Sequence, residues 1–186
     1  MGLRQGGRWL GFLGPGMVGK GHMGSWWLAA GGTRVRSVGQ AWQRAAAFAD
    51  RLGLRVGEVM RFSRNFSAEL RAGSGRPATE VLVDRAGGAV PIGYGPAMRW
   101  NTDDGMPYGT RSGTRVPAGR AKNIALAWLR ARDRMPTAGD PESYPGHYAL
   151  HTLHAGEITG MLSVDAATGQ VWDGTWHGTY IATGRR

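Results

Sequence analysis

Two stretches of this sequence, Val83-Asp-Arg-Ala-Gly-Gly-Ala-Val90 and Val164-Asp-Ala-Ala-Thr-Gly-Gln-Val171, share one pattern at a constant offset of 81 residues. In each, an aspartate at the end of an apolar stretch can accept hydrogen bonds from backbone amides two or three residues further on. The glycine four residues later can take the left-handed conformation that closes a hairpin. Turn formation is favoured over calcium binding or catalysis, because neither aspartate has a spaced set of further oxygen ligands. The residues that define the two predicted turns are Asp84, Gly88, Asp165 and Gly169.

A predicted helix precedes each of these hairpins. Ser37 and Gln40 form a capping box at the start of the first helix, and Gly53 supplies its expected end. Pro117 opens the second helix as a first-turn proline, and Pro136 prevents its continuation. Both helices carry apolar stripes at three- and four-residue spacing. The large residues expected in the core are Trp42 and Phe48 on the first helix, Trp128 on the second, and Trp172 and Trp176 near the C-terminus.

Short stretches that favour strands follow each helix and are separated by glycine-containing turns. These stretches are 56–63, 66–72 and 79–84 after the first helix, and 147–153, 158–164 and 170–176 after the second. Trp172 and Trp176 share one face of the last stretch at strand spacing, so they are expected to cover the sheet. The sequence therefore predicts an α+β fold of two tandem repeats, each a helix followed by a small antiparallel β-meander.

Length and composition favour two small units packed together rather than two independent ones. The chain has 186 residues and 41% hydrophobic residues in spite of 32 glycines, so it can form a globular core. With no cysteine, disulfides, thiolate zinc sites and thiol nucleophiles are excluded. The predicted organisation is a poorly ordered glycine-rich segment 1–33, a first repeat 34–100, a glycine-rich linker 101–115, a second repeat 116–181 and a tail 182–186.

The positive charge comes almost wholly from arginine. The net charge is +10 at pH 7, and Lys20 and Lys122 are the only lysines among 23 basic residues. The arginines are spread from Arg4 to Arg186 without a cluster of five, which favours a solvated basic surface over a dedicated nucleic-acid face. An arginine-rich nucleic-acid-binding protein remains the alternative function.

The helix followed by a Val-Asp-x-x-x-Gly-x-Val hairpin resembles the PepSY domain, the small α+β module of metallopeptidase propeptides and of many extracytoplasmic bacterial proteins. Four stretches are similar to a group of bacterial exported tandem-PepSY proteins: 58–66, 95–101, 160–172 and 175–181. The resemblance covers about residues 34–181. It implies a secreted or membrane-anchored protein that binds or regulates a protein partner, such as a peptidase. The methionine-glycine runs typical of that group are reduced here to 14–24 and 105–109.

Soft metal binding is the one chemical activity that the sequence permits, because thioether sulfur prefers cuprous ion to harder metals. The candidate ligands are Met17, His22, Met23, Met98 and Met106, with His177 as a further candidate. In the alternative interpretation the methionines fill gaps and pack on tryptophan. In the same alternative interpretation, His177 lies beside Trp176 and Tyr180 as a buried, hydrogen-bonded histidine that fixes the C-terminal segment.

No set of residues indicates an enzyme. His147 and His151 share one face of a predicted strand and His154 the other, which excludes a local three-histidine site. No serine has spaced partners for a triad, no phosphate-binding glycine loop is present, and Asp103-Asp104 lack an acid partner. The prediction is a non-catalytic extracytoplasmic binding or regulatory protein whose partner is a protein or a soft metal ion such as copper.

The N-terminal segment is expected to contain no transmembrane helix. Its longest apolar stretch, 9–18, is broken by Pro15 and is shorter than the roughly 20 residues needed to span a bilayer. Trp26 and Trp27 lie outside the predicted core and are the only tryptophans left for stacking on single-stranded bases; contact with a membrane surface or a remnant of an export signal is an equal alternative for them.

Overall fold

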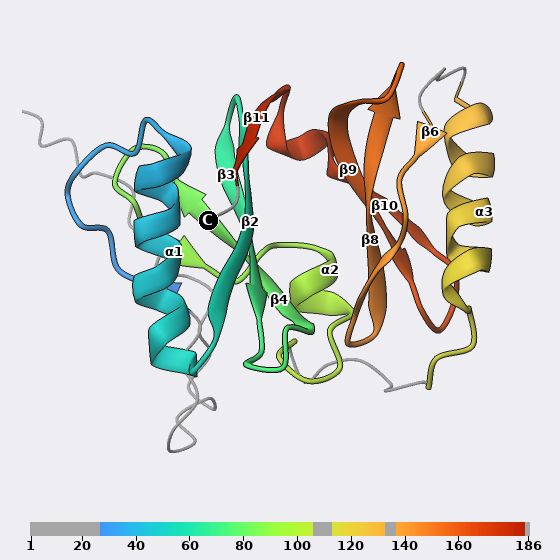
Figure 1. The fold of residues 1–186 in the computed structure, drawn as a ribbon, viewed down its shortest axis with the longest axis horizontal. Coiled ribbons are helices and arrows are strands. Elements are labelled where there is room, and N and C mark those ends of the chain that lie inside the picture. Colours follow the sequence, from blue (N-terminus) through green and yellow to red (C-terminus); the bar gives the residue numbers. More distant parts are fainter. Residues whose placement is uncertain (1–26, 106–112, 133–136, 185–186) are drawn as a thin grey trace, which may run out of the picture.

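The computed structural model describes residues 27–105, 113–132 and 137–184. They form four layers in the order helix, sheet, sheet, helix (Figure 1). Helix α1 (Val38–Leu52) covers the outer face of one sheet, and helix α3 (Ala118–Arg130) covers the outer face of the other. The coarse prediction of a mixed α+β fold with antiparallel sheets is confirmed. No helix in these described ranges is long and apolar enough to cross a membrane.

The first sheet has the strand order β11-β2-β3-β4, with all neighbours antiparallel. Its strands are β2 (Arg55–Phe62), β3 (Asn65–Arg71), β4 (Pro77–Asp84) and β11 (Tyr180–Gly184). After β4 the chain turns into β5 (Val90–Pro91), which pairs with β1 (Trp27–Leu28), and then forms the short helix α2 (Pro96–Arg99).

The second sheet has the order β10-β9-β8-β6, and β7 also pairs with β8. Its strands are β6 (Thr137–Ala138), β7 (Glu142–Tyr144), β8 (His147–His154), β9 (Glu157–Asp165) and β10 (Val171–Asp173). A 3₁₀-helix, η2 (Gly174–His177), then leads the chain back to the first sheet.

Each sheet forms a separate hydrophobic core with its own helix. In β3, Phe66 and Leu70 point toward α1, where they meet the fully buried Phe48. Behind α3, Leu129 packs with Leu150 from β8. Burying side chains of this size contributes about 1.5–3 kcal/mol each. Most of the buried apolar side chains of the described residues therefore lie in two helix–sheet interfaces, and the surface between the sheets contains more polar groups.

The predicted start and end of the first helix are confirmed. The Ser37 hydroxyl accepts a hydrogen bond from the Gln40 N–H at 3.2 Å, and the Gln40 side chain accepts one from the Ser37 N–H at 3.3 Å. Gly53 adopts a left-handed φ of 67°, as expected of a helix-ending glycine. Pro117 precedes the first residue of α3, and the predicted stop at Pro136 lies outside the described residues.

Two expectations at the C-terminus were wrong. The predicted tail 182–186 is strand up to Gly184, because β11 pairs with β2, with Tyr180 opposite Phe62. The predicted strand 170–176 ends at Asp173, whose carboxylate accepts a hydrogen bond from the Thr175 N–H at 3.1 Å and so caps the 3₁₀-helix. The first sheet is therefore completed by the last strand of the chain.

The N-terminal boundary also needs correction. The predicted poorly ordered segment extended to residue 33, yet β1 pairs with β5 and Gly31 N–H donates to Gly87 O at 2.9 Å. These bonds fasten residues 27–33 to the hairpin that follows β4. Residues 1–26, Trp26 among them, lie outside the described part of the chain.

The predicted core tryptophans lie at the edges of the cores, whereas Phe48 lies at the centre of one. Trp42 and Trp128 are only partly buried, because alanines such as Ala45 and Ala125 occupy the middle of each helix stripe. Arg132 stacks its guanidinium 3.7 Å from the centroid of the Trp128 ring. Small residues at the helix centre let each helix lie close to its sheet.

Candidate functional site

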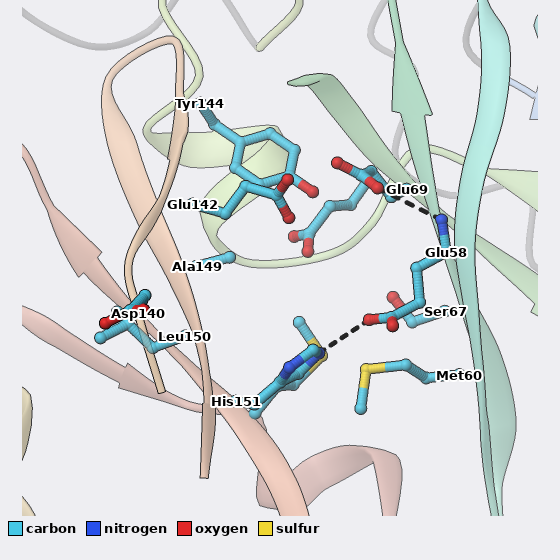
Figure 2. A pocket seen from close by; sticks show the side chains of 12 residues that line it. Glu58, Met60, Ser67, Glu69, Asp140, Glu142, Tyr144, Ala149, Leu150 and His151 are labelled. Carbon is cyan, nitrogen blue, oxygen red and sulfur yellow. Dashed lines mark hydrogen bonds and ion pairs between the residues drawn. The ribbon is translucent and has the colours of Figure 1, made fainter. Parts of the chain in front are cut away.

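A cavity lies between the facing surfaces of the two sheets (Figure 2). The cavity has a volume of about 60 Å³, enough for a few water molecules. The first sheet lines it with Glu58, Met60, Ser67, Glu69 and Glu80. The second unit lines it with Glu142, Tyr144, His151 and Met161. Polar and acidic side chains thus take the place of the apolar core that usually joins two packed sheets.

Strand alternation brings these glutamates together. On β3, Phe66 and Leu70 face α1, so the residues between them face the second sheet, and Glu69 is one of these. The neighbouring strands present Glu58 from β2 and Glu80 from β4 on the same side. Three carboxylates from adjacent strands therefore point into one enclosed space.

Arg71 neutralises one side of this space. Its guanidinium forms an ion pair with Glu69 Oε1 at 2.7 Å and another with Glu142 of the opposite sheet. Glu69 Oε2 accepts a hydrogen bond from the Glu58 N–H at 3.2 Å. This approach requires Gly57, because a Cβ at that position would collide with the Glu69 carboxylate. The arginine and two glutamates therefore connect the sheets electrostatically.

Burial makes two of the glutamates weak acids. Burial, followed by the negative charge of Glu142, raises the pKa of Glu69, and hydrogen bonds from the Glu58 amide and Arg71 oppose this. Burial, with the charges of Glu69 and Glu142, raises the pKa of Glu80 to about 7, and His151 opposes this. The carboxyl of Glu80 is therefore partly protonated at neutral pH, which limits the negative charge in the cavity.

The other side of the cavity contains His151. Its Nε2 lies 2.7 Å from Glu58 Oε2, and this contact joins β8 to β2 (Figure 2). Met60 turns its thioether toward the same ring, and Met161 lies directly opposite His151 in the β8–β9 ladder. A histidine, a carboxylate and two thioethers are thus gathered at one place.

The cavity lacks the contacts of a hydrolytic triad. Ser67 lines it near the Glu58–His151 pair, but among the described residues the Ser67 hydroxyl makes no hydrogen bond to the His151 ring. A serine nucleophile is normally activated by such a bond to its base. What the arrangement can do chemically is to hold a proton or to bind a cation.

His177 lies outside this cavity, in a tight aromatic stack. It is 4% exposed, its Nδ1 is 2.7 Å from Asn65 Oδ1, and its ring lies between Phe62 at 4.7 Å and Trp176 at 3.8 Å. Burial lowers its pKa to about 4. This arrangement is that of a buried, hydrogen-bonded histidine, and it fastens η2 and β11 to the β2–β3 hairpin.

The N-terminal metal candidates cannot be placed. Met17, His22, Met23 and Met106 lie outside the described residues, and Met98 packs at the edge of the first core. Within residues 27–105, 113–132 and 137–184, no group of three or more histidine, aspartate or glutamate side chains is arranged to hold a metal ion.

The two aspartate turns have matching geometry. Asp84 Oδ2 accepts a hydrogen bond from the Gly87 N–H at 2.6 Å, and Asp165 Oδ1 accepts one from the Thr168 N–H at 2.7 Å. The closing glycines, Gly88 and Gly169, have φ values of 71° and 77°. All four predicted residues therefore act in turns, and their carboxylates are used by backbone amides.

His147 and His154 of β8 have different surroundings, and the two C-terminal tryptophans lie on different elements. His147 is fully buried against Tyr144, with ring centroids 4.9 Å apart, and burial lowers its pKa to about 4, whereas His154 is exposed at the end of β8. Trp172 packs edge-on against Trp100, and Trp176 belongs to η2, so the two tryptophans do not share a strand face as predicted.

Sequence reasoning missed the inter-sheet glutamates. The available signal was the position of Glu58, Glu69 and Glu80, each in the middle of a predicted strand or at most two residues from its start. Polar residues at such positions usually lie on a solvated sheet face in antiparallel sheets, so they did not indicate a site. The second sheet covers that face instead.

No protein-family model matches the sequence, and no match was found among curated proteins or among solved structures.

Proposed function

We propose that this chain is a non-catalytic binding or regulatory protein built from two tandem PepSY-like repeats. Its partner is a protein, such as a peptidase, or a soft metal ion such as copper. The observation that carries the proposal is the inter-sheet cavity, whose polar groups bind one another across the two sheets and leave no activated nucleophile among the described residues.

The arrangement of elements supports the duplication. Helix α1 precedes β2, β3 and β4, and α3 precedes β8, β9 and β10. The last long strand of each set ends in the same turn: Asp84 O accepts from Gly88 N–H at 3.0 Å, and Asp165 O accepts from Gly169 N–H at 2.9 Å. After each turn the chain runs back along the strand it has just left.

Contacts between the two halves support a single binding unit rather than two separate ones. Trp172 of the second half packs so closely on Gly95 that a Cβ at position 95 would come within 2.7 Å of the indole. Asn101 holds the start of the linker by donating to Ala78 O at 2.7 Å and accepting from two amides. Several motifs that carry the PepSY resemblance therefore have structural roles at the junction of the halves.

Turnover assays test the non-catalytic proposal. Purified protein is incubated with peptide, ester and phosphate substrates, next to a His151→Gln variant. We expect no turnover above the buffer rate with either protein. Turnover by the wild type that the single substitution abolishes would refute the proposal, because it would make the Glu58–His151 pair catalytic.

An extracytoplasmic location is part of the proposal and rests on the PepSY resemblance. Fractionation of cells that express the full-length gene product tests it. We expect the protein in the extracytoplasmic fraction, where protease added to intact cells reaches it if it is surface-bound. Recovery only from the cytoplasm would contradict the proposed location.

A further inference from the structure

We infer that the His151 side of the inter-sheet cavity is a binding site for monovalent copper, with ligands from His151, Met60, Met161 and Glu58. The inference deepens the proposed binding role and rests on it. It places the soft metal site between the two sheets rather than among the N-terminal methionines.

The fold brings the four side chains together from three strands. Glu58 and Met60 are two residues apart on β2, so both point toward the second sheet. Met161 of β9 pairs directly with His151 of β8, and the Cβ atoms of such cross-strand pairs are about 5 Å apart. The Glu58–His151 contact at 2.7 Å then closes the space between the sheets (Figure 2).

The donor set suits a soft ion. Two thioether sulfurs and one imidazole nitrogen favour cuprous copper, whereas magnesium and calcium prefer oxygen ligands. Met60 lines the cavity and is only 4% exposed, so bulk solvent has little access to its side chain. Thioethers carry no proton, so cuprous ion binds them without displacing one.

The charge balance favours a monovalent ion. A histidine ligand binds Cu⁺ through Nε2 as a neutral imidazole with its proton on Nδ1, so coordination replaces the Nε2 hydrogen bond to Glu58. Cu⁺ keeps its oxidation state, and the neighbouring Glu58 carboxylate balances its single charge, which offsets part of the desolvation cost. A divalent ion would leave an additional positive charge in this space.

The glutamates on the other side of the cavity are less suited to a metal. Arg71 already lies between Glu69 and Glu142 and forms ion pairs with both. A hard cation there would have to displace the guanidinium. Among the described residues that line the cavity near His151, none is an arginine or a lysine.

Backbone packing holds Met161 in position. A Cβ at Gly174 would come within 2.9 Å of Met161 Cγ and 2.5 Å of Met161 O, so only glycine allows η2 to lie this close. The thioether on β9 is therefore constrained before any metal arrives, which reduces the ordering cost of binding.

The test is a titration of the full chain with cuprous ion under anaerobic reducing conditions, in competition with a chromogenic cuprous chelator. A Met60→Leu/Met161→Leu variant removes both sulfurs and keeps the apolar volume. Met98→Leu, outside the cavity, is the matched control, and Met17→Leu/Met23→Leu tests the N-terminal alternative. Proton–carbon spectra of the methionine methyl groups report which sulfurs are bound.

We expect one cuprous ion per wild-type chain, an affinity at least about tenfold weaker for the cavity variant, and no change for the two other variants. The Met60 and Met161 methyl signals should shift, and that of Met98 should not. Unchanged affinity of the cavity variant, loss of binding in the N-terminal variant, or displacement of copper by magnesium would overturn the site. The turnover assays test the non-catalytic function independently of copper binding. If the chain binds no copper and turns over no substrate, the copper site is refuted and the non-catalytic function is not.

Discussion

Replacing Glu80 by glutamine should make the protein more stable at alkaline pH and leave it unchanged in acid. Burial and the charges of Glu69 and Glu142 raise the pKa of Glu80 from 4.5 to about 7. A carboxyl whose pKa is raised by folding stabilises the folded state fully below its unfolded pKa. That contribution is lost as pH rises through the folded value. Glu80→Gln keeps the shape and removes the titration.

The size of the effect follows from the two pKa values. One pKa unit corresponds to about 1.4 kcal/mol, so the difference between 4.5 and about 7 amounts to about 3 kcal/mol at pH 8, as an order of magnitude. At pH 4.5 the two proteins should differ by less than about 0.5 kcal/mol. The window of change is therefore pH 4.5 to 7.

Urea unfolding followed by tryptophan fluorescence at pH 4.5, 6 and 8 measures these differences. Glu157→Gln, at an exposed position at the start of β9, is the matched control and should lie within about 0.5 kcal/mol of the wild type throughout. Two results would show that the cavity does not suppress ionisation of Glu80. One is a Glu80→Gln protein that is less stable than the wild type at pH 8. The other is a difference in the free energy of unfolding that is the same at pH 4.5, 6 and 8.

Three further predictions concern other parts of the chain. Gly88→Ala and Gly169→Ala force a left-handed φ on alanine and should each cost about 1–2 kcal/mol in urea unfolding; a large difference between the two would count against equivalent turns. Burial lowers the pKa of His177 from 6.5 to about 4, so the stability it contributes is present above pH 6.5 and lost as pH falls toward 4. His177→Phe should lose less stability over that window than the wild type, and parallel pH curves for the two would contradict the assignment. Fluorescence anisotropy with DNA and RNA should show no salt-dependent binding between roughly 50 mM and 200 mM salt, the range over which proteins that contact phosphates lose much of their affinity. Salt-dependent binding would support the arginine-driven alternative.

Local signals in the sequence predicted most of the secondary structure. Ser37, Gln40 and Gly53 define the ends of α1 through backbone hydrogen bonds that involve only near neighbours. Asp165 and Gly169 likewise define a turn within five residues. Such interactions depend on the identity of a few adjacent residues, so sequence alone is enough to predict them.

The return of the last strand to the first sheet was not predictable in the same way. Tyr180 pairs with Phe62, more than a hundred residues earlier, and nothing near Tyr180 specifies this partner. The predicted strand continued through Trp176, whereas β10 ends at Asp173. There the Asp173 carboxylate caps a 3₁₀-helix, and Gly174 packs closely on Met161.

The candidate site was missed for a related reason. A strand pattern shows that alternate residues face opposite sides, but it does not show whether water or protein covers the polar side. Glu58, Glu69 and Glu80 are typical of a solvated face until the second sheet is placed over them. The partner of Glu58 is His151 on β8 of the other sheet, and Arg71 of β3 also pairs with Glu142 of the other sheet, so these contacts exist only in the assembled structure.

The polar surface between the sheets has a consequence for how the halves stay together. The two largest apolar clusters pack each sheet against its own helix, and only a few buried apolar side chains, such as Met60 and Leu82, lie on the face toward the other sheet. Contacts of other kinds must hold them: the ion pairs of Arg71, the Glu58–His151 bond, the Trp172–Gly95 contact and the pairing of β11 with β2. Of these, only the strand pairing and the tryptophan contact are independent of pH. A ligand or proton that changes the charge of the cavity therefore acts on the part of the interface that depends on charge, while β11 keeps the two halves joined.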